Sequence, residues 1–283
     1  EATVNSPLTF TPANWDTPQT VTVTGVDEDI VDGTITSTIT IAVDDANSDD
    51  DFDGAADQTV SADTLDDDAA GFTVVELDGA TEVTEAGSTD TFTVVLDAQP
   101  TSDVVLTVTS DDTSEATVNN PLTFTPVNWD TPQTVTVTGA DDSIIDGTVT
   151  SSITVAVDDA NSDDDFDGVA DQTVSVDTTD DDVAGFTIVE LDGSTEVDES
   201  GTTDTFTVVL DAEPATDVVL TVTSDDTSEA TVNSPLTFTP ANWDTPQIVT
   251  VTGADDDLVD GTITSTITIA VDDANSDDGF DGL

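Results

Sequence analysis

The chain of 283 residues contains 64 Asp and Glu and no Lys, Arg, His or Cys, so its formal net charge is −64. This composition excludes internal salt bridges, disulfides and thiolate metal sites, and it disfavours nucleic acid and anionic membranes, which bind basic residues. Neutralisation must come from outside the chain, and the simplest candidate is a hard divalent cation held by carboxylate oxygens.

The distribution of apolar residues indicates a folded protein. Hydrophobic residues make up 35% of the chain, and Val, Ile, Leu and Phe alternate with Thr in runs that are separated by acid-rich segments. Such a pattern is typical of β-strands joined by acidic loops, although disorder in the absence of metal remains the alternative. No segment resembles a signal peptide or a 20-residue apolar span, and the chain starts in mid-pattern, which suggests an internal window of a longer protein.

The sequence repeats with a period of 114 residues. EATVNSPLTF begins at Glu1, and near-copies of it begin at Glu115 and Glu229 without insertion or deletion. This period is too long for one turn of a solenoid and suits a small globular domain. The expected domains are the C-terminal part of a β-sandwich at 1–70, a complete sandwich at 71–184, and a sandwich lacking its last strand at 185–283.

Seven strands are expected in the complete second repeat. TVTVTG and SSITVAV place Val or Ile on one face and Thr or Ser on the other, as in a half-buried antiparallel sheet. Seven short strands without a helical stretch predict an all-β, immunoglobulin-like Greek-key sandwich. In chain order the expected strands are 72–77, 91–96, 104–109, 116–125 (which Pro121 can interrupt), 133–138, 148–157 and 172–176.

One Trp occurs in each repeat, within the segment NWDTPQ. We expect Trp15, Trp129 and Trp243 to close the core near a sheet edge. The alternative is an exposed Trp that stacks on a ligand, because the flanking residues are polar.

The most specific metal signal is the spacing D-x-D-x-D-G-x-x-D in the loop after the sixth expected strand. It matches positions 1, 3, 5, 6 and 9 of an EF-hand loop, in which the glycine makes a tight turn. Val174 replaces the bidentate Glu at position 12, and flanking helices are missing, so the loop is not an EF-hand. Upstream Asp158, Asp159 or Asn161 could complete the shell. The expected calcium ligands are Asp49, Asp51, Asp53 and Asp57 (with Gly54), and Asp163, Asp165, Asp167 and Asp171 (with Gly168).

The third copy of this loop has Gly279 in place of the middle Asp, which should weaken it. Other acids cluster at the repeat boundaries, where two domains could clamp one cation, and in further loops. A solvated surface adapted to high salt is the alternative, but screening extends only about 8 Å at physiological salt, so adjacent carboxylates repel without an ion. The boundary clusters are Asp66, Asp67 and Asp68, then Asp180, Asp181 and Asp182; the loop clusters are Asp111, Asp112 and Glu115, then Asp141, Asp142 and Asp146, then Glu82 and Glu85.

These stretches resemble Calx-beta and related immunoglobulin-like repeats of large bacterial surface and secreted proteins. The resemblance rests on VTEAG and VDESG, on LTFTPxNWDTPQTVTVTG with the following DD-x-x-x-DG, and on the DDD before each repeat. In Calx-beta domains the Glu after the first strand, the acidic loops at one end and the closing Asp run bind calcium. The Gly-Thr-Ala and Asp-Tyr elements of the typical domain are absent. The resemblance implies several calcium ions per repeat, with ligands at Glu85, Glu199, Asp111, Asp112, Asp141, Asp142 and Asp180 to Asp182.

The sequence therefore predicts a non-enzymatic structural protein, a calcium-stiffened rod or fibre of tandem sandwiches on a cell surface or in a biofilm matrix. Extracellular calcium is millimolar and fills sites with dissociation constants of about 10⁻⁴ to 10⁻³ M. The expected partners are calcium ions, neighbouring repeats and like chains. The alternative is an adhesin-type module that contacts carbohydrate or another surface through Thr-rich faces or Trp. An enzyme is disfavoured, because only a carboxylate pair, as in glycosidases, is available for catalysis.

Overall fold

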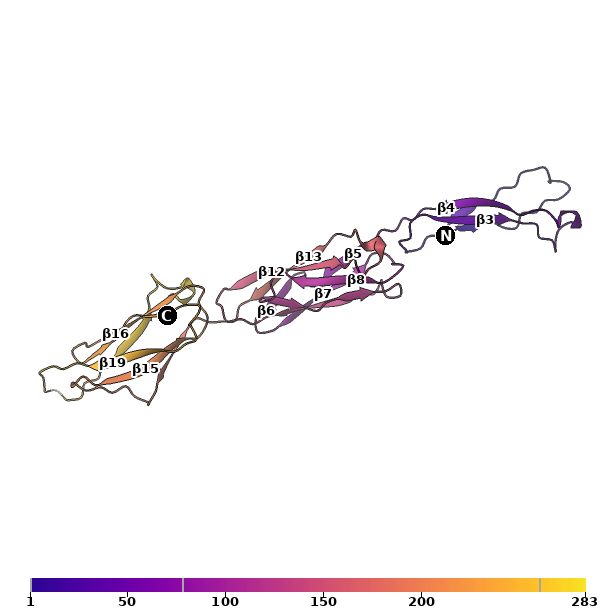
Figure 1. Ribbon diagram of the computed structural model, residues 1–283. Coiled ribbons are helices and arrows are strands. Elements are labelled where there is room, and N and C mark those ends of the chain that lie inside the picture. The colour runs from indigo at the N-terminus through magenta and orange to yellow at the C-terminus, as the bar shows by residue number, and fades with distance from the viewer. Residues whose placement is uncertain (1, 78, 260) are drawn as a thin grey trace.

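The computed structural model describes residues 2–77, 79–259 and 261–283, and Figure 1 shows three groups of strands that follow one another along the chain. The prediction of an all-β chain is confirmed, since the helical structure among the described residues consists of three short 3-10 turns. These are η1 (Asp50–Phe52), η2 (Asp164–Phe166) and η3 (Asp278–Phe280). Within the described ranges, no helix is long and apolar enough to span a membrane.

The second repeat is an immunoglobulin-like sandwich of two sheets. One sheet has the strand order β5-β7-β11-β9, and the other has the order β10-β8-β12-β13-β6. All neighbouring strands pair antiparallel except β6 and β13, which are parallel. The strands are β5 (Phe72–Glu76), β6 (Thr81–Thr84), β7 (Thr89–Leu96), β8 (Val104–Ser110), β9 (Ala116–Val118), β10 (Leu122–Phe124), β11 (Gln133–Gly139), β12 (Thr148–Val157) and β13 (Gln172–Thr179).

All seven expected segments of this repeat form strands, with two differences. The expected strand at 116–125 is split next to Pro121, and its halves join opposite sheets, since β9 pairs with β11 and β10 with β8. β6 was not expected, because TEVT is short and carries an acid. This strand matters for the site, because it leads directly into Glu85.

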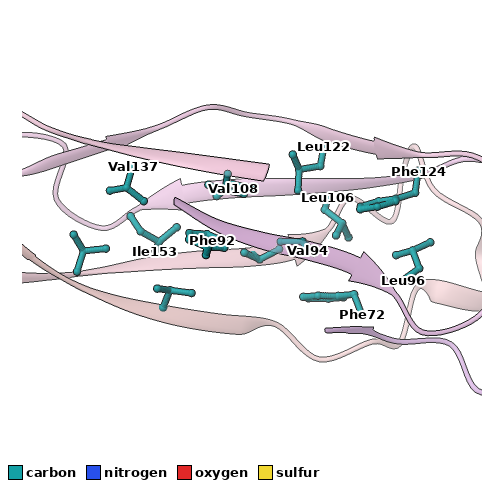
Figure 2. Close-up of a cluster of buried hydrophobic side chains, with 14 of the residues drawn as sticks. Phe72, Phe92, Val94, Leu96, Leu106, Val108, Leu122, Phe124, Val137 and Ile153 are labelled. Carbon is teal, nitrogen blue, oxygen red and sulfur yellow. The ribbon is translucent and has the colours of Figure 1, made fainter. Parts of the chain in front are cut away.

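The core of the second repeat lies between the two sheets (Figure 2). The alternation of apolar and polar residues turns the apolar side chains of facing strands inward, where Phe92, Leu106 and Ile153 are fully buried. Trp129 packs against the edge of this core, as expected, and Trp243 does the same in the third repeat. Trp15 is exposed.

The third repeat copies most of this arrangement. Its sheets have the orders β14-β15-β19-β17 and β18-β16-β20. No counterpart of β13 occurs within residues 185–283, and residues 195–198, the counterpart of β6, are not a strand. The strands are β14 (Phe186–Glu190), β15 (Thr203–Leu210), β16 (Val218–Ser224), β17 (Ala230–Val232), β18 (Leu236–Phe238), β19 (Gln247–Gly253) and β20 (Ile267–Val271).

Residues 1–70 form two separate two-stranded ribbons. β1 (Ala2–Val4) pairs with β2 (Val23–Gly25), and β3 (Ile35–Ile41) pairs with β4 (Gln58–Thr64). These ribbons correspond to parts of β9 and β11 and of β12 and β13 in the second repeat. Residues 1–70 carry no counterparts of β5 to β8, so their apolar faces are largely exposed.

Candidate metal centre

Glu85 lies in the turn that follows β6. Figure 1 shows β6 at the end of the second sandwich that is nearer the third repeat. The parallel pairing of β6 with β13 brings the turn to this end, and the Glu85 N–H donates to the Thr179 carbonyl at 3.1 Å. The residue is only 1% exposed, and neither of its carboxylate oxygens has a hydrogen-bond partner. Burying an unpartnered carboxylate is unfavourable unless a positive charge compensates for it.

Gly139, at the end of β11, explains how this turn can approach the sheet so closely. A Cβ atom built on Gly139 would lie 2.0 Å from the Thr84 carbonyl oxygen, so a side chain cannot fit there. Gly253 stands in the same relation to the Asp198 carbonyl oxygen in the third repeat. The glycine that ends the VTVTG segment therefore allows the turn that carries Glu85 or Glu199 to pack against the sheet.

Glu115 and Asp146 face Glu85 from two other segments. Glu115 immediately precedes β9, is 4% exposed, and has one carboxylate oxygen, Oε2, that is buried without a partner. Its backbone carbonyl is fixed by the Ala140 N–H at 2.8 Å and the Thr178 hydroxyl at 3.3 Å. Asp146 belongs to the loop between β11 and β12. One carboxylate oxygen from each of Glu85, Glu115 and Asp146 lies within 4.8 Å of the others.

The Asp run after β13 contributes a second group. One Asp180 oxygen accepts from the N–H groups of Asp146 and Gly147, at 3.1 and 2.9 Å, and the other accepts from the Asp182 N–H at 2.7 Å. These bonds hold the run against the β11–β12 loop. Ligand oxygens of Glu85, Asp180 and Asp182 also lie within 4.8 Å of one another, and Asp182 Oδ2 is buried without a partner.

The electrostatics of the cluster follow from burial and like charge. Burial, and after it the charges of Asp142 and Asp180, raises the pKa of Glu85 to about 7. The nearby backbone N–H of Asp181 lowers the pKa of Glu85 and so opposes this shift. It does not make a hydrogen bond to either carboxylate oxygen. The pKa values of Glu115, Asp146 and Asp182 are raised as well, first by burial and then by neighbouring carboxylates. A bound cation would relieve all of these shifts, because it stabilises the ionised form.

The donor set fits a hard divalent cation. Calcium binds oxygens at about 2.3–2.6 Å, so two ligands of one ion lie up to about 5 Å apart. Both carboxylate groups meet this limit, and they share Glu85. The arrangement therefore suits one cation or two adjacent cations, with Glu85 as a ligand common to both.

The structure brings together three of the ligands expected from sequence, Glu85, Asp180 and Asp182, and adds Glu115 and Asp146, which had been noted only as members of acidic clusters. The sequence does not single out these two residues. Glu115 and Asp146 are unchanged in all three copies, but so are Asp141 and Asp163, which do not join the cluster.

Other expected ligands of the second repeat serve different purposes or remain apart. Asp111 accepts from the Ser152 N–H of β12 at 2.7 Å and so joins the end of β8 to β12. Asp112 accepts from the Ser114 N–H at 3.0 Å and holds a local turn. Asp142 contributes its charge to the cluster, as the raised pKa of Glu85 indicates. Asp141 and Asp181 are exposed.

The D-x-D-x-D-G loops do not gather their carboxylates into a metal-ligating group in any described part of the chain. Asp163 instead caps η2, accepting from the Asp165 N–H at 3.2 Å and from the Thr101 hydroxyl and the Ser102 N–H at 2.7 Å each. Burial alone would raise the pKa of Asp163, but these hydrogen bonds lower it. Asp165, Asp167 and Asp171 are exposed.

The reason for this difference is the backbone of the loop. A 3-10 turn replaces the tight turn of an EF-hand loop, and Gly168 is not in the left-handed region. Asp277 caps η3 in the same way, accepting from the Thr216 N–H at 2.6 Å. In the first copy Asp49 caps η1, and Asp51, Asp53 and Asp57 are exposed.

The other repeat boundaries resemble the cluster only in part. Asp66 repeats the contacts of Asp180, accepting from the N–H groups of Asp32 and Gly33 at 3.0 and 2.8 Å. Asp67 is exposed, and burial together with nearby Asp charges raises the pKa of Asp68. No counterpart of Glu85 occurs within residues 1–70. Its counterpart in the third repeat, Glu199, is half-buried.

No protein-family model and no curated protein matches the sequence. Among solved structures, the apo-form Calx CBD1 domain is 16% identical, covering 41% of this chain and 100% of its own, with a TM-score of 0.30. The calcium binding domain CBD12 of CALX1.1 is 15% identical over 71% of this chain and 79% of its own, with a TM-score of 0.29. Domains 4–9 of the surface layer protein SbsC are 22% identical over 76% of this chain and 33% of their own, with a TM-score of 0.28. At such scores these likenesses carry no argument about function.

Proposed function

We propose that the chain is a non-enzymatic, calcium-binding structural protein in which each 114-residue repeat is one β-sandwich domain. The observation that carries this proposal is the burial of Glu85 and Glu115 with carboxylate oxygens that have no partner. Every other charged group around them is also acidic, and the chain contains no basic residue to neutralise them. An external cation is the remaining source of positive charge, and a flexible set of carboxylates suits calcium better than the strictly octahedral magnesium.

Calcium also suits an extracellular location. Sites that must fold around repelling carboxylates bind weakly, and only the millimolar calcium outside cells would fill them. There the cation stabilises the folded repeat by mass action, because the unfolded chain does not assemble the site. The domains under this proposal are 1–70 (part of a sandwich), 71–184 (complete) and 185–283 (without its last strand), arranged as a rod or fibre on a cell surface or in a biofilm matrix.

An adhesin role through stacking on Trp is less well supported. Trp129 and Trp243 are half-buried and pack against the cores of their repeats, which occupies part of the ring surface that a sugar would need. The Thr-rich strand faces remain available, but no cluster or cavity on them indicates a ligand among the described residues.

The test is thermal unfolding of the 283-residue chain and of Glu85→Gln in calcium, in magnesium and in chelator. We expect calcium to raise Tm more than magnesium does. The substitution should have opposite effects on Tm in chelator and in calcium. In chelator it removes a buried charge that nothing neutralises, whereas in calcium it removes a ligand of the ion. Glu85→Gln should therefore melt above the unsubstituted chain in chelator and below it in calcium.

Glu82→Gln is the matched control, since Glu82 is exposed on β6, only three residues before Glu85. This variant should follow the unsubstituted chain in every condition. Melting that is indifferent to calcium, magnesium and chelator would refute calcium binding and favour adaptation to high salt.

A further inference from the structure

Successive repeats contact each other through one loop, which joins the counterparts of β11 and β12. Isolated parallel bridges pair Ile30 with Gln99 and Ile144 with Glu213. Ile144 and Glu213 lie 114 residues after Ile30 and Gln99, which is one repeat. The two contacts are therefore copies of each other. We refer to residues 27–31, 141–145 and 255–259 as the docking loops.

Backbone hydrogen bonds define the register of each contact. The Gln99 N–H donates to the Asp29 carbonyl at 2.6 Å, and the Val31 N–H donates to the Gln99 carbonyl at 3.2 Å. At the second boundary the Glu213 N–H donates to the Ser143 carbonyl at 2.7 Å, and the Ile145 N–H donates to the Glu213 carbonyl at 3.4 Å. A two-bond bridge at the same position in both boundaries is a specific interface.

Apolar side chains complete the contact. Val31 packs against the core of the second repeat, and Ile145 packs against the core of the third. Ile145 Cγ2 lies 3.5 Å from where a Cβ atom would stand on Gly279, beside the fully buried Phe280 of η3. The receiving site is therefore the turn that carries Gln99 or Glu213, together with the 3-10 turn that the capping Asp holds in place.

The third docking loop keeps the apolar pair but has nothing packed on it. Leu258 and Val259 correspond to Ile144 and Ile145, yet Leu258 is 66% exposed and Val259 is fully exposed. Two adjacent apolar side chains in an otherwise acidic loop are costly to leave in water. The equivalent loops at both other boundaries identify what covers such a pair.

We propose that the docking loop 255–259 is an interaction site for a further copy of the same repeat. The incoming repeat would pair its counterpart of Glu213 with the backbone around Leu258 and would pack the edge of its core on Val259. The donating loop and the receiving turn lie at opposite ends of a repeat, so the contact is head-to-tail. This inference adds an assembly surface to the proposed function and does not depend on calcium binding.

The experiment extends the chain by a copy of residues 170–283 placed after Leu283, which continues the repeat in register because Leu283 corresponds to Val169. Amide hydrogen exchange is then measured at Val259 in calcium and in chelator. The Val259 amide should be unprotected in the original chain and at least tenfold slower in the extended chain, like the amides of Val31 and Ile145. Val259→Asp should abolish this protection, whereas Val127→Asp, at another exposed valine, should preserve it.

An unprotected Val259 amide in an extended chain whose added core amides are protected would overturn the proposal. If the added copy does not fold, Ile145→Asp in the original chain provides the test. It should expose the amides of residue 145 and Glu213 while the core amide of Val249 stays protected, and unchanged protection of Glu213 would also overturn the proposal. Neither readout is a calcium-dependent melting shift, so failure of docking and failure of calcium binding are distinguishable.

Discussion

Residues 1–70 and residues 115–184 are near-copies in one chain, yet the structure gives them different environments. Phe124 is fully buried, whereas its counterpart Phe10 is 54% exposed. Asp182 has a buried oxygen next to Glu85, whereas Asp68 has no Glu of this kind nearby, because none occurs within residues 1–70. The second repeat carries β5 to β8 ahead of these strands. The comparison teaches that burial and site assembly depend on partner strands rather than on the local sequence.

The most demanding test of the comparison supplies the missing strands. Placing a copy of residues 71–114 ahead of Glu1 should convert the two ribbons into a sandwich, because it provides counterparts of β5 to β8. Amides of β2 and β3 should then exchange at least a hundredfold more slowly, and calorimetric titration should detect additional bound calcium, since a Glu85 counterpart would face Asp66 and Asp68. Unchanged exchange in residues 1–70 would show that the partner strands are not the cause of the difference.

Core truncation should distinguish the two copies next. Phe124→Ala removes a fully buried ring and should lower the free energy of unfolding of the second repeat by about 3–5 kcal/mol. Phe10→Ala removes a ring that is already largely in water, so we expect a loss of less than about 1 kcal/mol. Urea unfolding in calcium measures both variants, and equal losses would contradict the difference in burial.

A matched pair of glycine substitutions tests whether the Glu85 turn needs its close approach to the backbone of β11. Gly139→Ala places a methyl group against the Thr84 carbonyl and should cost about 1–3 kcal/mol of stability while weakening calcium binding. Gly25→Ala is the control, because a Cβ atom there would meet only Thr64 Cγ2, at 3.6 Å. Calcium titration and urea unfolding of the two variants are compared. Tolerance of Gly139→Ala would mean that the turn does not need its close approach.

The stability of the second repeat should also depend on pH when calcium is removed by chelator. The pKa of Glu85 is raised to about 7 from 4.5, so between these values the folded state keeps a proton that the unfolded state has lost. Stability should therefore fall as pH rises from about 4.5 to 7, by up to about 3 kcal/mol, and then level off. Hydrogen exchange of β6 and β13 measures the change, and Glu85→Gln should flatten it. If the stability of Glu85→Gln depends on pH as strongly as that of the unsubstituted chain, Glu85 is not the cause of the pH dependence.

Much of the fold could be predicted from the sequence, because the alternation of Val with Thr is a local pattern that decides which residues form strands. The exceptions have identifiable causes. β6 is too short to show alternation and is held by its parallel pairing with β13. The split of the strand at Pro121 could be anticipated, but its division between two sheets depends on which partner each half meets.

The candidate site was less predictable. The D-x-D-x-D-G spacing is local and conspicuous, yet Asp163 uses its carboxylate to cap a 3-10 turn and to hold Thr101 and Ser102, which lie far away in sequence. Glu85 and Glu115 belong to loops with no metal-binding spacing. They meet because the end of β6, the start of β9 and the β11–β12 loop lie on the same side of the sandwich.

The sequence by itself determined the all-β character, the 114-residue repeat and the need for an external positive charge, since these follow from composition and local periodicity. Only the tertiary structure decided which carboxylates are buried together and which ones cap turns. It also decided that Ile145 is covered while Val259, its counterpart in the third repeat, lies in water. The physical reason is that burial is a property of contacts between segments distant in sequence, and identical segments acquire it only where their partners are present.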